Sequence, residues 1–315
     1  MRPPGANGQC SVMSHGAKVW VALGTIYVIW GSTYLGIELT GETIPALFGA
    51  AVRFLLAGLL MAAIAAVRRG PATFRMSTRE LAACAVVGVL LPGANAVLFI
   101  AERHVPTGLS SLIIGSVPLW VVLMRFATGD HPPATALAGV GLGFCGLVLL
   151  VRPSGGAPLW AMLLVVGSAL MWATGAFLSG RLPLPGDSFA ATAVEMLAGG
   201  LVLLPIALAT THPHFQSFSA RSIGGFFYLV TFGSLIGYTA FVWLLDNAPI
   251  QRVATYAYVN PVVAIGLGAL VLHESITWTI GLGAAMVLAS VAIVVRRETV
   301  EPEAEAAPAG AAAID

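Results

Sequence analysis

Apolar residues form long stretches along this chain, and polar residues gather in the short breaks between them. A helix that crosses the hydrocarbon core of a bilayer needs about 20 mostly apolar residues. Backbone groups in lipid must bond within their own segment, so these stretches are predicted to be α-helices. Proline occupies most of the breaks, where it ends a helix. Ten spans are predicted, at residues 19–39, 46–67, 80–101, 106–127, 134–151, 159–180, 188–210, 222–245, 249–272 and 276–295.

Composition supports an all-α integral membrane protein. Hydrophobic residues make up 58% of the chain and charged residues 9%, and the mean hydropathy is +0.90. A soluble domain carries about 25% charged residues, so lipid is the expected solvent. The net charge of +1, without a basic patch, argues against nucleic acid as a partner. Cys10, Cys84 and Cys145 are scattered, which predicts neither a disulfide framework nor a metal cluster.

The two halves of the chain repeat each other. Arg53 lies 23 residues after Trp30, and Glu195 lies 23 residues after Trp172. Their flanks also match, AVRFLLAGL against AVEMLAGGL. Each half holds five spans, an odd number, so the second half is predicted to enter the membrane from the opposite side as an inverted repeat, an arrangement typical of transporters. The predicted units are repeats at 18–152 and 158–297, with disordered tails at 1–17 and 298–315.

Lys and Arg predict the orientation. With the N-terminus in the cytoplasm, eleven of them fall in cytoplasmic segments and three fall outside, namely Arg103, Arg152 and Arg221. Cytoplasmic loops carry an excess of Lys and Arg, so both termini are predicted to be cytoplasmic.

Several segments, in order, resemble the EamA-type drug/metabolite transporters of the drug/metabolite exporter family, and most of all the YedA-like branch. They are IWGSTYLGIEL, AVRFLLAG, AERHVPTG, VEMLAGG and ATYAYVNPVVAIGLGALVLHESIT. The resemblance covers about residues 19–295. It implies a ten-helix carrier in the cell inner membrane, and many members export metabolites or amino acids. One feature departs from the pattern: the family has a Glu after spans four and nine, and here only Glu274 keeps it, against Asp130-His131 in the first half.

Arg53 and Glu195 are the most telling polar residues, because each is predicted a few ångströms from the bilayer midplane. An unpaired charge there costs at least about 2.5–3.5 kcal/mol. We expect them to face a cavity, where Glu195 exchanges a proton or meets a cationic group and Arg53 tunes it or meets an anionic group. The alternative is that both only anchor helices.

Aromatic, hydroxyl and amide side chains mark the same depth. Broken or kinked helices near the midplane are a recurrent way to build a transporter site, and Pro118 and Pro261 are expected to break spans four and nine. Ordinary helix packing is the competing explanation for these residues. The candidate substrate-binding residues are Trp30, Ser32, Asn95, Trp172, Tyr238, Tyr256 and Asn260.

Polar groups at span ends fit helix capping better than function. They are Glu102, Asp130, His131, His273 and Glu274. Small residues in spans five and ten, Gly139 with Gly143 and Gly281 with Ala285, suit tight helix packing or a homodimer interface, and the pattern leaves both open.

These patterns predict a secondary transporter of small polar metabolites, with a proton as one candidate coupling ion. Export is favoured by the family resemblance alone. An intramembrane enzyme is disfavoured, because the chain has no His-Glu-x-x-His or Gly-x-Ser-x-Gly motif. A non-transporting scaffold or sensor has no need for paired charges near the midplane. No cofactor or metal site is expected, because a phosphate-binding Gly-x-x-x-x-Gly-Lys-Ser/Thr loop is missing and His212 with His214 is weak metal evidence.

Overall fold

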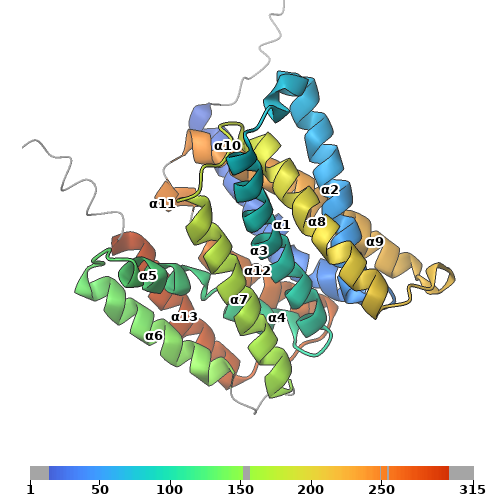
Figure 1. The fold of residues 1–315 in the computed structure, drawn as a ribbon. Helices are drawn as coiled ribbons and strands as arrows, with labels where there is room; N and C mark the ends of the chain where they lie inside the picture. The colour runs from blue at the N-terminus through green and yellow to red at the C-terminus, as the bar shows by residue number, and fades with distance from the viewer. Residues whose placement is uncertain (1–13, 152–156, 249, 254, 298–315) are drawn as a thin grey trace, which may run out of the picture.

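The computed structural model of this chain describes residues 14–151, 157–248, 250–253 and 255–297, and all regular structure in these ranges is helical. Of the tails predicted at 1–17 and 298–315, residues 1–13 and 298–315 lie outside the described residues. The prediction is wrong for residues 15–17, which form the first turn of α1. The helices are α1 (His15–Gly41), α2 (Ala46–Arg69), α3 (Thr78–Glu102), α4 (Thr107–Ile114), α5 (Val117–Ala127), α6 (Ala134–Leu150), α7 (Leu159–Ser179), α8 (Ser188–Thr210), α9 (Ala220–Tyr228), α10 (Gly237–Asn247), α11 (Ile250–Val253), α12 (Tyr256–Val271) and α13 (Trp278–Arg297) (Figure 1).

The ten predicted spans are found as helical segments, and seven of them are long and apolar enough to cross a bilayer. Two of the seven are composite: α4 with α5, and α9 with α10. The other three predicted spans are shorter apolar helices, α6, α12 and α13. That these three also cross the membrane stays a prediction. α1 begins at His15, earlier than predicted, because the Ser14 side chain caps it by accepting a hydrogen bond from the Ala17 amide at 3.3 Å.

The two predicted proline breaks have different outcomes. The first half is interrupted between α4 and α5, with Pro118 in the first turn of α5. The prediction for Pro261 is wrong, because α12 continues through this residue. Pro261 lies near the start of α12, where its missing amide leaves only the carbonyl of Ala257 without a helical donor, and one lost bond does not end the helix. The second half has a different irregularity: a π-helical stretch, Leu229–Ile236, joins α9 to α10.

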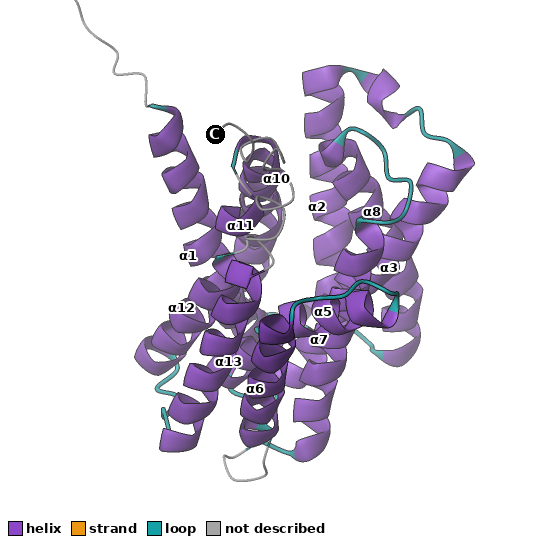
Figure 2. Ribbon diagram, turned by 90° about the vertical axis from the view of Figure 1, so that its left-hand side faces the viewer, coloured by secondary structure: helices purple, strands orange, loops and turns teal. Residues whose placement is uncertain are grey.

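Helices of the two halves pack against each other in matched pairs. α2 lies along α8, α6 along α13, α3 along α7, and α1 along α9, α10 and α12. Figure 2 shows α1 and α10 on one side and α2 and α8 on the other. The contact of α3 with α8 is made through backbone: a Cβ added at Gly88 would lie 2.2 Å from the carbonyl oxygen of Glu195, and one at Gly199 would lie 2.3 Å from the carbonyl oxygen of Gly88. Glycine therefore sets how closely these helices approach.

We call the end of the bundle that carries His15 and Arg69 the termini end, and the other the far end. At the far end the two repeats are joined by side chains. Glu274, just after α12, accepts hydrogen bonds from Thr107 N (2.7 Å), Thr107 Oγ1 (3.0 Å) and Gly108 N (3.1 Å). It thereby caps α4 of the other repeat, whose own N-cap, Pro106, has no capping side chain. The preceding residue, His273, has φ 57°, and this left-handed turn leads the chain out of α12 into Glu274.

The capping prediction is wrong for Asp130. The residue that precedes α6 is Pro133, and the Asp130 carboxylate instead accepts from Arg125 Nε at 3.0 Å and lies 3.6 Å from Arg181 Nη2. The hydrogen bond from Arg125 lowers the pKa of Asp130. The two halves therefore differ in contacts at the position where the sequence departs from the family pattern. Glu274 ties two repeats together, whereas Asp130 forms a surface ion pair.

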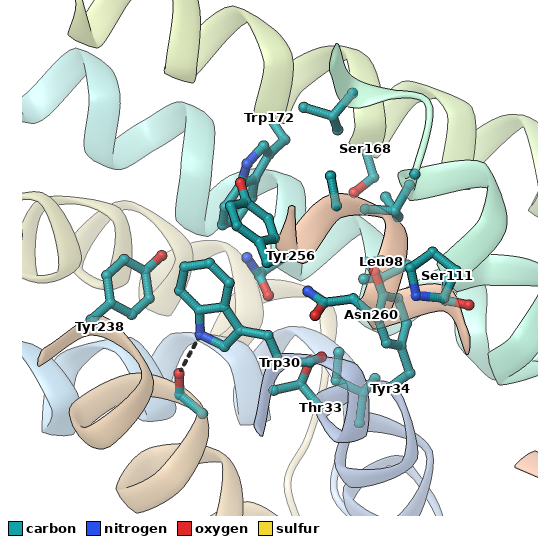
Figure 3. A pocket seen from close by; sticks show the side chains of 18 of the residues that line it. Trp30, Thr33, Tyr34, Leu98, Ser111, Ser168, Trp172, Tyr238, Tyr256 and Asn260 are labelled. Carbon is teal, nitrogen blue, oxygen red and sulfur yellow. Dashed lines mark hydrogen bonds between the residues drawn. The ribbon is translucent and has the colours of Figure 1, made fainter. Parts of the chain in front are cut away.

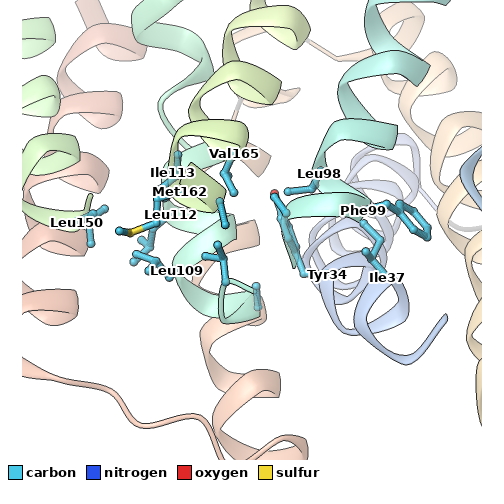
Figure 4. Close-up of a cluster of buried hydrophobic side chains, with 14 of the residues drawn as sticks. Tyr34, Ile37, Leu98, Phe99, Leu109, Leu112, Ile113, Leu150, Met162 and Val165 are labelled. Carbon is cyan, nitrogen blue, oxygen red and sulfur yellow. The ribbon is translucent and has the colours of Figure 1, made fainter. Parts of the chain in front are cut away.

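Buried apolar side chains fill the space between α4 and α7 and between α1 and α3 toward the far end (Figure 4). Leu112 and Ile113 of α4 are completely buried, as are Val165 of α7 and, to within 1%, Phe99 of α3. Gly139 and Gly143 of α6 pack against α13, where Ser290 Oγ donates to the Gly139 carbonyl at 2.6 Å. These two glycines thus serve packing within the chain. Gly281 and Ala285 are exposed, so the homodimer stays a prediction.

Candidate functional site

A cavity of about 130 Å³ lies between helices of both repeats. Its walls come from α1, α2, α3, the α4–α5 break and α7, together with the π-helical stretch, α10 and α12. Figure 3 shows side chains from these elements converging on it. The lining includes seven of the nine candidate residues: Trp30, Arg53, Asn95, Trp172, Tyr238, Tyr256 and Asn260. Residues far apart in the sequence therefore line the same cavity.

Trp30 is the centre of an aromatic wall. Its ring centroid lies 5.6 Å from that of Tyr238 and 5.1 Å from those of Phe241 and Tyr256. Its indole Nε1 donates to the carbonyl of Gly233 in the π-helical stretch at 3.3 Å, the bond drawn in Figure 3. The π-helical stretch thus supplies a backbone acceptor for Trp30. An aromatic wall of this kind suits a ring or a methylene chain.

Two amides are held by backbone carbonyls. Asn95 Nδ2 donates to the Leu91 carbonyl at 3.3 Å. With its Nδ2 turned to the carbonyls of Tyr27 and Tyr256, Asn260 donates to both, at 3.3 and 3.2 Å. Asn260 thus uses both of its N–H donors on the protein and Asn95 uses one, and each leaves its side-chain oxygen as an acceptor for another partner. Pro92 lies inside α3 and leaves the carbonyl of Gly88 without a helical donor. Asn95 does not donate to this carbonyl, which lies against Gly199.

Arg53 is the cation of the cavity wall. It is 4% exposed, its Nε donates to Ser234 Oγ at 3.1 Å, and its guanidinium carbon lies 5.1 Å from the ring centroid of Phe54. Nη1 is buried and has no hydrogen-bond partner in the part of the chain that the structure describes. No Asp or Glu is among the residues that line the cavity. A buried guanidinium with an unused donor has a strong preference for an anionic partner.

The structure does not place two candidates at the cavity. The hydroxyl of Ser32 bonds within its own helix, to Val28 O at 2.7 Å and Ile29 O at 2.9 Å, and it meets Tyr228 Oη at 2.5 Å. Glu195 lies beside α3 with its backbone against Gly88, and it is not among the residues that line the cavity. The two equivalent positions thus have different surroundings: Arg53 donates to Ser234 of the π-helical stretch, while Glu195 lies at the α3–α8 contact.

Sequence reasoning missed several lining residues. Thr33, Tyr34 and Ile37 follow Trp30 at the spacing of one helix face, so the helical period of α1 carried the signal. No sequence signal pointed to Ser111 and Ser168, because a Ser in a span more often bonds its own backbone. Ser111 does so, whereas Ser168 Oγ donates across to Ala94 O at 2.7 Å.

A wider cleft of about 1040 Å³ opens at the termini end between α1 and α10 on one side and α2 and the start of α8 on the other. Its wall carries His15, Lys18, Arg68 and Arg69. Asp187 is its carboxylate, and it lies 3.3 Å from Arg69 Nε. Within the described residues, no group of three or more His, Cys, Asp or Glu side chains is placed to hold a metal ion.

Comparisons with known proteins agree with this architecture. The model of the EamA-like transporter family matches residues 18–152 and 159–296. The chain is 34% identical over 254 residues to the uncharacterized inner membrane transporter YedA of Escherichia coli K12, covering 78% of this chain and 80% of YedA. It is 24% identical to a probable amino-acid metabolite efflux pump of the same strain, covering 84% and 90%.

An archaeal relative, an uncharacterized transporter of Archaeoglobus fulgidus, is 26% identical, covering 87% of this chain and 96% of that one. A crystal structure at 20% identity covers 91% of this chain and all of the other, with a TM-score of 0.62, which shows a shared fold. The two matched repeats and the transporter relatives place the chain among transporters, as expected, and not among enzymes. The chain belongs to the EamA-like transporter family.

Proposed function

We propose that this protein is a secondary transporter in the cell inner membrane that exports small polar metabolites carrying an anionic group, amino acids among them. The observation that carries the proposal is the cavity between the repeats, whose wall holds the buried Arg53 with an unused Nη1. The name of the amino-acid efflux relative supports export and the substrate class. In this proposal both termini face the cytoplasm.

The cavity suits a zwitterionic or anionic metabolite. A carboxylate accepts well from a guanidinium, the amide oxygens of Asn95 and Asn260 accept from an ammonium or hydroxyl group, and Trp30 covers an apolar part. The cleft at the termini end lies along the same helices as the aromatic wall: α1 lines the cleft at Thr25 and the cavity at Trp30, and α10 lines the cleft at Thr239 and the cavity at Tyr238. Its Lys and Arg side chains would attract an anion. Access then alternates by rocking of two inverted repeats around the cavity.

The test is binding and counterflow with paired compounds. Purified protein is screened for thermal stabilisation by amino acids and by their carboxamides, which lack the anionic group. Carboxylates are expected to stabilise the wild type and amides are not. Compounds that bind are then tested for counterflow in proteoliposomes.

The variant Arg53→Gln keeps donors and removes the charge. Loss of a charge-assisted bond costs about 1.5–3 kcal/mol, so binding is expected to weaken by about tenfold or more. Arg181→Gln is the matched control, because Arg181 is exposed and pairs with Asp130 far from the cavity. Equal binding of amides and carboxylates, or unchanged affinity in Arg53→Gln, would rule out the anionic substrate.

A further inference from the structure

Glu102, the last residue of α3, is buried at the far end, and none of the described residues bonds to its carboxyl group. It is 3% exposed, and neither carboxyl oxygen has a hydrogen bond. An ionised carboxylate that loses water without gaining a donor or a cation is among the most costly groups to bury, and the neutral acid is far cheaper. Capping does not explain this residue, because a cap must accept a hydrogen bond.

The titratable groups around Glu102 are mostly acidic. Glu38 of α1 and Glu274 after α12 are carboxyl groups whose negative charge would repel a Glu102 carboxylate, and the Tyr34 hydroxyl of α1 is also nearby. Arg103 is the neighbouring cation, and its Nη1 donates to the Gly41 carbonyl at the end of α1. From α4, the groups at this end are the Thr107 and Gly108 donors that Glu274 already uses.

Glu102 continues the cavity wall. Asn95 and Leu98 both line the cavity, and Glu102 follows them on the same face of α3, four residues or about 6 Å beyond Leu98. On α1, Tyr34 lines the cavity and Glu38 follows it one turn later. The carboxyl groups of Glu102 and Glu38 thus lie at the far end of the two helix faces that line the cavity. This end is closed by the bonds from Arg103 to α1 and from Glu274 to α4.

We propose that Glu102 is a proton-binding site, which holds its proton while the far end is closed and releases it when that end opens to water. Any state that binds the proton more tightly is favoured by low pH, so proton binding and closure of this end are linked. With the termini in the cytoplasm, the site faces the outside, where protons would favour closure. The proton is then the coupling ion of the proposed transporter; this step and the outward orientation of the site rest on the proposed function.

Infrared difference spectroscopy of the purified protein tests the site without a substrate. The probe is the proton itself, added or removed by changing pH in sodium-free buffer and again with sodium. The wild type is expected to show the carbonyl band of a protonated carboxylic acid at neutral pH, which is lost at alkaline pH. Glu102→Gln, which mimics the neutral acid in size, should reduce the intensity of that band by the contribution of one carboxyl group. Glu102→Asp should keep a band at a shifted position.

Glu42→Gln is the matched control, because Glu42 lies one turn after Glu38 but is exposed and pairs with Arg221 at 3.2 Å. It should leave the band unchanged. An undiminished band in Glu102→Gln, or a carboxylate band at neutral pH that depends on sodium, would overturn the proton site.

Transport tests the coupling separately. In proteoliposomes Glu102→Gln should keep counterflow but lose accumulation driven by a pH gradient. Retained pH-driven accumulation would overturn the coupling role. If no compound gives counterflow even in the wild type, the proposed function fails, while the infrared result still decides the proton site.

Discussion

The cross-repeat cap made by Glu274 predicts an asymmetry that can be measured as stability. Replacing Glu274 with Ala removes the acceptor for three donors and leaves the amides of Thr107 and Gly108, both buried, without a partner. Each buried donor left unsatisfied costs about 1–3 kcal/mol, and loss of an N-cap costs about 0.5–2 kcal/mol. Because these terms describe the same bonds, they do not add, and we expect a loss of about 2–4 kcal/mol.

Glu274→Gln keeps one acceptor oxygen and removes the charge near the positive end of α4. The helix-dipole interaction is worth about 0.3–1 kcal/mol at exposed sites and up to about 2 when partly buried, so a loss of about 1–2 kcal/mol is expected. The assay is reversible unfolding in mixed micelles, with the denaturing detergent as titrant. Asp130→Asn is the control at the equivalent position of the first half. Its carboxylate is 44% exposed and pairs with surface Arg side chains, so a small effect is expected.

Thr107→Val completes the experiment as a double-mutant cycle. It removes the hydroxyl that donates to Glu274, so it should cost less in the Glu274→Ala background than in the wild type. Equal losses for Glu274→Ala and Asp130→Asn would refute the reasoning that Glu274 joins the two repeats.

Three further predictions follow from other parts of the fold. Gly88→Ala and Gly199→Ala should each destabilise the protein by about 1–3 kcal/mol, because the added Cβ meets backbone. Gly167→Ala, with open space around it, should be neutral or stabilising by up to about 1 kcal/mol. Similar effects of all three substitutions on thermal unfolding in detergent would contradict this prediction. Burial raises the pKa of Asp187, but hydrogen bonds from the amides of Ala190 and Phe189 and from Thr73, with Arg69 nearby, outweigh it and lower the pKa. The stabilisation by the Asp187 carboxylate is therefore present above the unfolded pKa of about 3.9 and is lost as pH falls through the lower folded pKa. The difference in stability between wild type and Asp187→Asn should then be constant near neutral pH and shrink in acid. A difference that does not change with pH argues against a role of the carboxylate. Finally, in intact cells a cysteine at the exposed Ser217 should react with an impermeant thiol reagent and one at the exposed Ala72 should not, and the reverse labelling would reject cytoplasmic termini.

The sequence by itself determined what depends on solvent and on local spacing. Lipid requires about 20 apolar residues a span and bonds within each helix, so the ten helical segments, the two repeats and the family could be read from the chain. The matched Trp30 and Trp172, and the polar residues at similar depth, pointed to seven side chains that meet at one cavity, because helices of fixed rise bring equal depths together.

Only the tertiary structure decided which polar groups find partners. Ser32 bonds within α1 and Glu195 packs its backbone on α3, and neither lines the cavity. Which residues of a helix reach the cavity depends on the rotation of that helix, and a sequence does not encode this rotation separately from packing. Pro261 stays inside α12, where it removes one helical bond, and the irregularity of that half appears instead as the π-helical stretch, which accepts hydrogen bonds from Arg53 and Trp30. Glu102 and Glu274 both end a span and look alike in sequence, yet one finds three donors across the repeats and the other finds none. That difference arises from which helix ends meet at the far end, and contacts between distant segments exist only once the chain has folded.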